Sequence, residues 1–264
     1  MNTEKKMSFL DHLEELRWRL VKCSVSILAI SVVIWWNQEW IMNHVFLSMA
    51  HPDFITFKFM HKYFGVVPAD IVLNMQNIDL SGQFSYALMT SIMGGVVFSF
   101  PYIFYQIWSF VKPGLKQNEK SMASGIIFYV SILFFLGIAF GYLIVAPLCV
   151  QFFSTFTMSS QIVNSPTISS YMSMILSTVF YTGLLFLLPV LSYLLSKLGI
   201  ITAEFLRKYR KHAIVGVLII AAAITPPDLI SQIIVAIPII LLYEIGILVV
   251  VRVEKNKRKL EQTT

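Results

Sequence analysis

The 76 residues between Lys120 and Lys197 contain no Asp, Glu, Lys, Arg or His. A soluble domain does not leave so long a stretch uncharged, because its surface must face water. The stretch has room for two helices of about 20 residues that each cross a bilayer, with a connection between them. The whole chain is 57% hydrophobic and 13% charged, with a mean hydropathy of +0.74. The sequence therefore predicts an all-α integral membrane protein with several spans.

The basic residues predict the topology of these spans. Of the 20 lysines and arginines, all but Lys58 and Lys62 fall into four clusters, at 5–22, 112–120, 197–211 and 252–259. Because basic residues near span ends are kept in the cytoplasm, each interval between clusters must leave the cytoplasm and return to it. Three intervals predict six transmembrane helices with both termini inside, at about 20–36, 84–108, 122–147, 168–195, 212–225 and 229–251.

The fifth of these spans is short. Residues 213–224 give 12 apolar positions, about 18 Å of helix against a hydrocarbon core of about 30 Å. The segment is either a short span beside a thinned bilayer or a re-entrant piece. The parity of the basic clusters favours the short span.

Two further features concern the shape of the protein. Residues 37–82 form the longest loop, which we expect to be a partly structured extracytoplasmic cap. Prolines lie in or near four spans, where each removes a helix hydrogen bond and favours a kink. Kinked helices build concave walls, so the sequence predicts a concave helical wall; these prolines are at positions 101, 147, 189 and 238.

The patterns of common catalytic sites are missing from the sequence. It has no His-Glu-x-x-His, no Gly-x-Ser-x-Gly and no glycine-rich phosphate loop. His51, His61 and Asp53 could bind a metal in the long loop, but their spacing favours ordinary loop residues. Cys23 and Cys149 are expected near opposite membrane faces, as packing residues and not as a disulfide. We therefore predict a protein that is not an enzyme, with no cofactor and no metal.

Glu119 is an isolated acid at a predicted membrane border. It is the only acid between Asp79 and Glu204, and it follows an aromatic helix that should end at Pro113-Gly114. A lone carboxylate in this position invites a cationic partner. Gln106 and Phe110, in the helix just before it, could line a binding groove, although aromatic residues at a membrane rim more often only anchor a helix.

Glu15 lies in an amphipathic segment at the amino terminus. Leu13, Leu16 and Leu20 share one face of this segment, and Glu15 precedes Arg19 by four residues. The residues alone favour an interfacial helix with internal salt pairs. If the helix instead folds back against the second cytoplasmic loop, Glu15 and Glu119 could hold two guanidinium groups in forked hydrogen bonds.

Three polar residues lie in the last span or directly before it. Asp228 follows two prolines and is well placed to cap the helix. Gln232 lies one turn later, and Glu244 lies eight residues before Arg252. An intramembrane acid suggests a function, although a neutral carboxyl bonded to a neighbouring helix is about as plausible. The functional interpretation leads to an alternative, a small proton-coupled solute transporter that uses Glu244.

Several segments together resemble one family. They include His12-Leu-Glu-Glu-Leu-Arg-Trp-Arg19, Trp108-Ser-Phe-Val-Lys-Pro-Gly-Leu115 and Thr225-Pro-Pro-Asp228. These motifs are similar to those of TatC, the multi-spanning subunit of the twin-arginine protein translocase. The resemblance covers nearly the whole chain in order, and the family's six spans with both ends in the cytoplasm agree with the charge pattern.

The resemblance implies a receptor in the bacterial cytoplasmic membrane. Folded proteins with an Arg-Arg signal peptide would dock on its cytoplasmic face, single-span TatA- and TatB-type subunits would assemble, and the proton-motive force would drive export. The resemblance implies a homo-oligomer within the receptor complex, and no nucleic-acid partner is expected.

The resemblance also implies roles for particular residues. Glu15 and Glu119 fall on the family's signal-recognition acids, Phe110 on the adjoining aromatic and Arg17 on the basic position of the amino-terminal motif. Asp228 and Gln232 match positions linked to partner contact and transport. In one departure, Leu187 stands two residues before Pro189, where many bacterial members carry a glutamate, so a carboxylate at this position cannot take part here.

Overall fold

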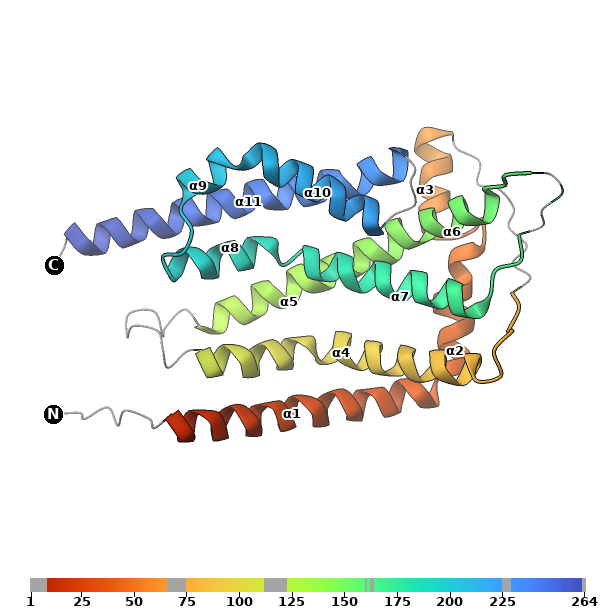
Figure 1. Cartoon of the computed structure of the whole chain (residues 1–264), viewed down its shortest axis with the longest axis horizontal. Coiled ribbons are helices and arrows are strands. Elements are labelled where there is room, and N and C mark those ends of the chain that lie inside the picture. The colour runs from red at the N-terminus through yellow and green to blue at the C-terminus, as the bar shows by residue number, and fades with distance from the viewer. Residues whose placement is uncertain are drawn as a thin grey trace. The chain divides into compact units, whose positions relative to one another are not determined.

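The computed structural model describes residues 9–65, 75–111, 123–159, 161, 164–224 and 229–262. These ranges are almost entirely helical and contain no strand, only a single bridge between Gln76 and Thr167, so the predicted all-α class is confirmed (Figure 1). The α-helices are α1 (Phe9–Trp36), α2 (Gln38–Ile41), α3 (Ile55–Phe64), α4 (Gly82–Val111), α5 (Ala123–Phe140), α6 (Ala146–Thr155), α7 (Ile168–Leu185), α8 (Leu188–Lys197), α9 (Ala203–Lys208), α10 (Arg210–Ile224) and α11 (Leu229–Gln262).

Five helical segments of the described chain are long and apolar enough to cross a membrane. They are His12–Trp36, Gly82–Phe110, Gly125–Thr155, Ile168–Lys197 and Gln232–Lys257. A sixth apolar helix, α10, has only 15 residues and corresponds to the expected short span. The chain is a multi-pass membrane protein, while the count of six spans, their orientation and the concave wall stay predictions.

The first helix extends beyond the predicted span. The sequence predicted a span at 20–36 after a separate amphipathic segment that could fold back, but α1 is one continuous helix of 28 residues. No glycine or proline interrupts residues 9–36, so the helix has no reason to break between its amphipathic and apolar parts. The last helix likewise continues beyond the predicted span, through a charged segment to Gln262, and the bounds of the spans themselves stay predictions.

The prolines act in different ways. Pro101 and Pro238 lie inside the continuous helices α4 and α11. Before Pro189, the fourth span divides into α7 and α8, and the break includes Leu187. In the third span a π-helical turn, Gly141–Val145, separates α5 from α6 just before Pro147. Two of the four prolines therefore accompany a change in helix geometry.

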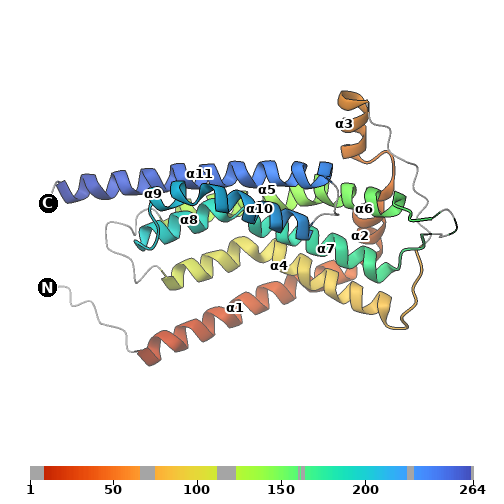
Figure 2. The same ribbon diagram turned by 45° about the horizontal axis from the view of Figure 1, so that its top comes forward.

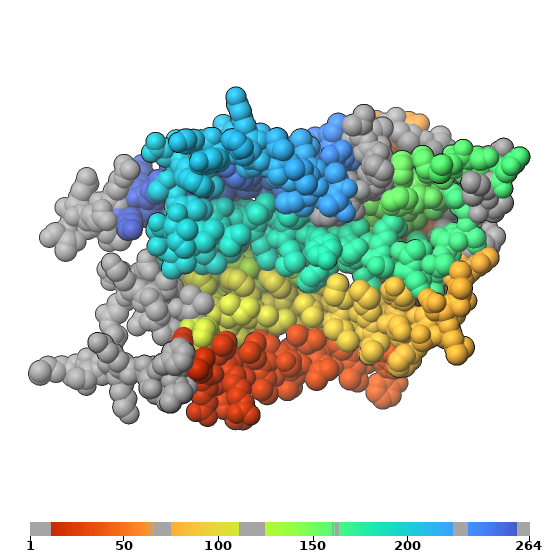
Figure 3. Space-filling view, viewed as in Figure 1, coloured from red at the N-terminus to blue at the C-terminus, as the bar shows by residue number. Residues whose placement is uncertain are grey.

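The chain divides into two compact units, which we describe separately. The first contains residues 1–41 and 84–132, and the second residues 42–83 and 133–264. In the first unit α1 and α4 run side by side (Figures 1 and 3). A Cβ on Gly95 would lie 2.2 Å from Ser31 Oγ and 2.7 Å from the Ile27 carbonyl oxygen. Glycine therefore permits the close approach of these two helices.

In the second unit, the core lies between the third span and the helices α10 and α11. Its buried members are Val145, Cys149, Val217, Ala221, Val235, Ala236 and Ile239. The loop predicted as a cap contains α2 and α3, and its part in this unit is tied to the spans by hydrogen bonds. Tyr142 Oη donates to the Val45 carbonyl oxygen at 2.9 Å, and Tyr171 Oη donates to that of Phe46 at 2.6 Å. The side of the membrane on which this cap lies stays a prediction.

Candidate functional site

Arg19 connects the beginning of α1 with the end of α4. Its Nε and Nη2 donate to Glu15 Oε1, at 2.9 and 2.5 Å. Its Nη1 donates to Gln106 Oε1 at 3.1 Å and to the Gln106 carbonyl oxygen at 3.4 Å. The expected pairing of Glu15 with Arg19 is confirmed. Gln106 is 5% exposed, so its side chain supports Arg19 from within the helix pair instead of lining an open groove.

The other carboxylate oxygen of Glu15 has a different environment. Oε2 is shielded from solvent and accepts no hydrogen bond from the described residues. His12 Nδ1 lies 3.9 Å from this oxygen, and the His12 ring stacks on Phe110 with ring centroids 4.2 Å apart. Because a shielded acceptor without a donor is unfavourable, this oxygen is suited to receive a donor from a ligand.

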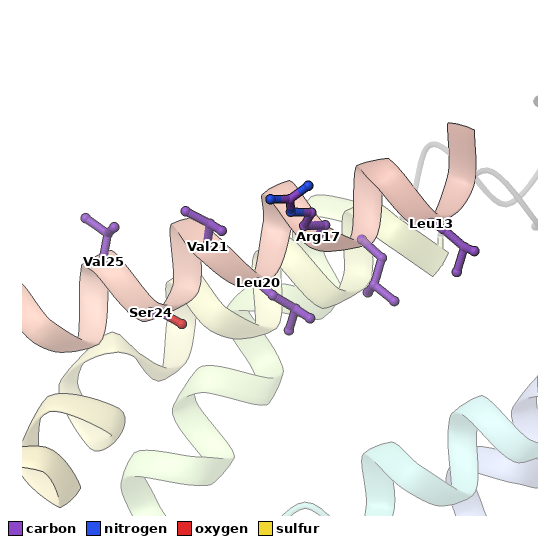
Figure 4. Close-up of a pocket in the computed structure, with 7 residues that line it drawn as sticks. Leu13, Arg17, Leu20, Val21, Ser24 and Val25 are labelled. Carbon is purple, nitrogen blue, oxygen red and sulfur yellow. The ribbon is translucent and has the colours of Figure 1, made fainter. Parts of the chain in front are cut away.

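Arg17 lies apart from this cluster. Two positions from Glu15 on the same helix, it points to a different face and lines an open groove of about 430 Å³. Figure 4 shows Arg17, Val21 and Val25 along one side of α1 and Leu13 and Leu20 along another, and all five line the groove. Arg17 forms no ion pair with any described residue. The site on α1 therefore combines a shielded acid and a free cation on separate faces.

Two of the predicted site residues lie outside the described part of the chain. These are Glu119 and Asp228. The pairing of Glu15 with Glu119 and the capping of the last helix by Asp228 therefore stay predictions.

In the second unit, the two remaining predicted residues connect α10 and α11. Gln232 Nε2 donates to the Leu218 carbonyl oxygen at 3.2 Å. Glu244 forms a forked pair with Arg210, with Nε to Oε1 at 2.7 Å and Nη2 to Oε2 at 2.8 Å. The Glu244 side chain is 38% exposed. Glu244 is thus not an unpaired acid, which removes the observation that motivated the transporter alternative.

We expect Glu244→Gln to have a small effect. Because both side chains of the Arg210 pair are well exposed, the loss in the free energy of unfolding should stay below about 1 kcal/mol. The midpoint of thermal unfolding in detergent, compared with that of Arg210→Gln and of the double variant, measures this. A loss of several kcal/mol would instead show that the pair behaves as a buried one.

His51, His61 and Asp53, whose spacing favours ordinary loop residues over a metal site, include one residue with a structural partner. Asp53 pairs with Lys58 at 3.3 Å. Among the described residues, no group of three His, Cys, Asp or Glu side chains is placed to hold a metal ion. Cys23 and Cys149 are both free and buried, as expected of packing residues.

His12 is a member of this cluster that the sequence patterns did not single out. His12 was noted only as the first residue of a motif, although its spacing of three from Glu15 puts the two on one helix face. Its stacking on Phe110 could not be inferred from spacing, because that contact depends on how α1 and α4 align along each other.

The fold and the site define a multi-pass helical membrane protein with a carboxylate site at the end of its first helix pair. The family model of the Sec-independent protein translocase protein (TatC) matches residues 11–238. The chain therefore belongs to the TatC family.

Individual relatives agree with this assignment. The TatC of Blattabacterium sp. subsp. Periplaneta americana is 37% identical over 97% of this chain and 99% of its own length. The TatC of Haemophilus influenzae is 34% identical over 94% of this chain and 90% of its own length. A crystal structure of the twin-arginine translocase receptor TatC in DDM superimposes with a TM-score of 0.69 and 30% identity, and the match covers 90% of this chain and 99% of that one.

Proposed function

We propose that this protein is the signal-peptide receptor and core assembly subunit of a twin-arginine translocase, which exports folded proteins by means of the proton-motive force. It acts in the bacterial cytoplasmic membrane with both termini in the cytoplasm. Membership of the TatC family and the crystal structure of a TatC receptor support this function. The single observation that carries the site is Glu15 Oε2, shielded from water and without a donor among the described residues.

The chemistry of this oxygen suits a guanidinium group. A signal arginine would donate to Glu15 Oε2 while Arg19 keeps the other oxygen in place. The stacked rings of His12 and Phe110 offer a flat surface beside the carboxylate, on which a planar guanidinium can lie. Glu119 is the proposed acid for the second signal arginine.

Partner subunits would bind to a second set of residues, apart from the signal-peptide site. Asp228 and Gln232 are the proposed contacts for single-span TatA- and TatB-type subunits, and Gln232 is held where α10 and α11 pack together. The active receptor complex is proposed to contain more than one copy of this chain, within the lipid bilayer and without nucleic acid.

The nature of the signal's cations tests the site. In detergent or nanodiscs, the full chain should bind a signal peptide with an Arg-Arg pair at least about tenfold more tightly than the same peptide with Lys-Lys, because an ammonium group cannot reproduce the forked, planar contact. Fluorescence anisotropy of the labelled peptide measures both affinities. Equal affinities would contradict the site, and no binding of either peptide would contradict the function.

A further inference from the structure

The helix α3 exposes a row of large apolar side chains. Ile55, Phe59 and Tyr63 follow one another at intervals of four residues and are 63%, 56% and 63% exposed. The rings of Phe59 and Tyr63 lie 4.6 Å apart. Exposure of three such side chains to water is unfavourable, because burial of their apolar surface would lower the free energy. An apolar environment outside the chain would therefore stabilise this row of side chains.

A row of lysines runs beside the apolar one. Lys58 and Lys62 are one turn apart on α3, and both are exposed. They are also the two basic residues that lie outside the four clusters of the sequence. Lys62 Nζ lies 5.6 Å from the centre of the Tyr63 ring. Lysines next to aromatic and aliphatic side chains are typical of a membrane interface, where the stem lies along the apolar phase and the ammonium group meets phosphate.

The remaining face of α3 fixes the helix against the third span. Thr56 Oγ1 donates to the Leu143 carbonyl oxygen, and the rings of Phe54 and Tyr142 meet edge to face at 5.8 Å. Phe57 is only 3% exposed. The level of Leu143 in the membrane therefore sets the level of α3.

The third span, Gly125–Thr155, is longer than the hydrocarbon core, so a core that begins at the expected cytoplasmic end of this span would end close to Leu143. Leu143 is 20 residues after Ala123, where α5 begins close to the cytoplasmic cluster of lysines. At about 1.5 Å per residue this is about 30 Å of helix, the thickness of the core. In Figures 1 and 2, α3 runs across the direction of α6 and α11, which belong to the same unit. A helix at this level and in this direction lies along the membrane surface.

We propose that α3 is an interfacial helix that inserts Ile55, Phe59 and Tyr63 into the phospholipid bilayer. Lys62 then contacts the lipid phosphates at that surface, and so does Lys58, whose ion pair with Asp53 is exposed and leaves other donors of its ammonium group available. The occupant of the exposed face is lipid and not a protein partner, because cationic and apolar rows lie side by side at the level of the core border. This inference goes beyond the proposed function and does not depend on signal-peptide binding.

Fluorescence quenching tests the position of α3. Phe59→Cys places a label in the apolar row, and His61→Cys is its matched control on the lysine side of the same helix. Each full-length variant is labelled with an environment-sensitive fluorophore in vesicles of phosphatidylethanolamine and phosphatidylglycerol. The unsubstituted chain, whose two cysteines are buried, gives the labelling background.

Lipids with a nitroxide at the shallow end of the acyl chain should quench the label at position 59 at least about twice as strongly as the label at 61, because the apolar face of an interfacial helix lies about 5–10 Å within the boundary. Aqueous iodide should show the opposite order. Strong iodide quenching at 59 would overturn the proposal in favour of a water-exposed row. Weak quenching by both agents would overturn it in favour of a protein that covers the row. Tyr63→Cys repeats the measurement if Phe59→Cys does not fold.

Discussion

Replacing Glu15 by glutamine should lower the affinity for an Arg-Arg signal peptide by at least about thirtyfold, because truncating one member of a shielded charge pair typically costs about 2–5 kcal/mol. Glutamine keeps an oxygen for Arg19 but replaces the other by an amide donor, which repels the donors of a guanidinium. Export of a folded cargo should fall with the affinity. Peptide anisotropy and the amount of exported cargo measure the two effects.

Glu14→Gln is the matched control for this change. Glu14 precedes Glu15 on α1 and is exposed. Its replacement by glutamine removes the same charge from the same end of the helix. If the general negative charge of the amino terminus attracted the signal, the two variants would behave alike. Equal affinities of the two variants would therefore contradict the role of Glu15. The level of each variant in the membrane separates loss of binding from loss of protein.

How much of this site the sequence could predict depends on how far apart its residues lie along the chain. The Glu15 and Arg19 pair follows from a spacing of four residues within one helix, and the structure contains it. The contacts of Gln106 and Phe110 with α1 do not follow from spacing. They require the alignment of α1 with α4, which is set by close contacts such as that of Gly95 with Ser31 and the Ile27 carbonyl group.

For the fold, too, the sequence predicted local features but not the contacts between distant residues. Charge-free runs predicted where the apolar helices lie, because burial in lipid demands long apolar segments. They did not predict that α1 begins at Phe9, since the charged first turns are compatible with either a separate or a continuous helix. Nor did they predict that Glu244 pairs with Arg210, which lies 34 positions earlier and meets it only when α10 and α11 pack antiparallel.

Gly137 should be the glycine of α5 whose replacement does most harm to the stability of the protein. A Cβ at this position would lie 2.7 Å from Phe186 Cβ, 2.8 Å from Phe186 Cγ and 2.9 Å from Gly183 Cα. None of these atoms is the end of a flexible side chain, so the third and fourth spans must move apart. We expect Gly137→Ala to lower the free energy of unfolding by about 1–3 kcal/mol, measured as a fall in the midpoint of thermal unfolding in detergent.

Gly125→Ala on the same helix separates crowding from helix propensity. A Cβ at Gly125 meets no atom within 4 Å, so this substitution should be neutral or should stabilise α5 by up to about 1 kcal/mol, because alanine favours a helix more than glycine does. Changes of opposite sign in the free energy of unfolding of the two variants would establish that the close contact of the spans, and not the flexibility of glycine, explains the effect of Gly137→Ala. Equal effects of the two substitutions would mean that the spans do not touch at this point. Since the break between α7 and α8 lies at Phe186 and Leu187, Gly137 then also decides whether that break can pack against α5.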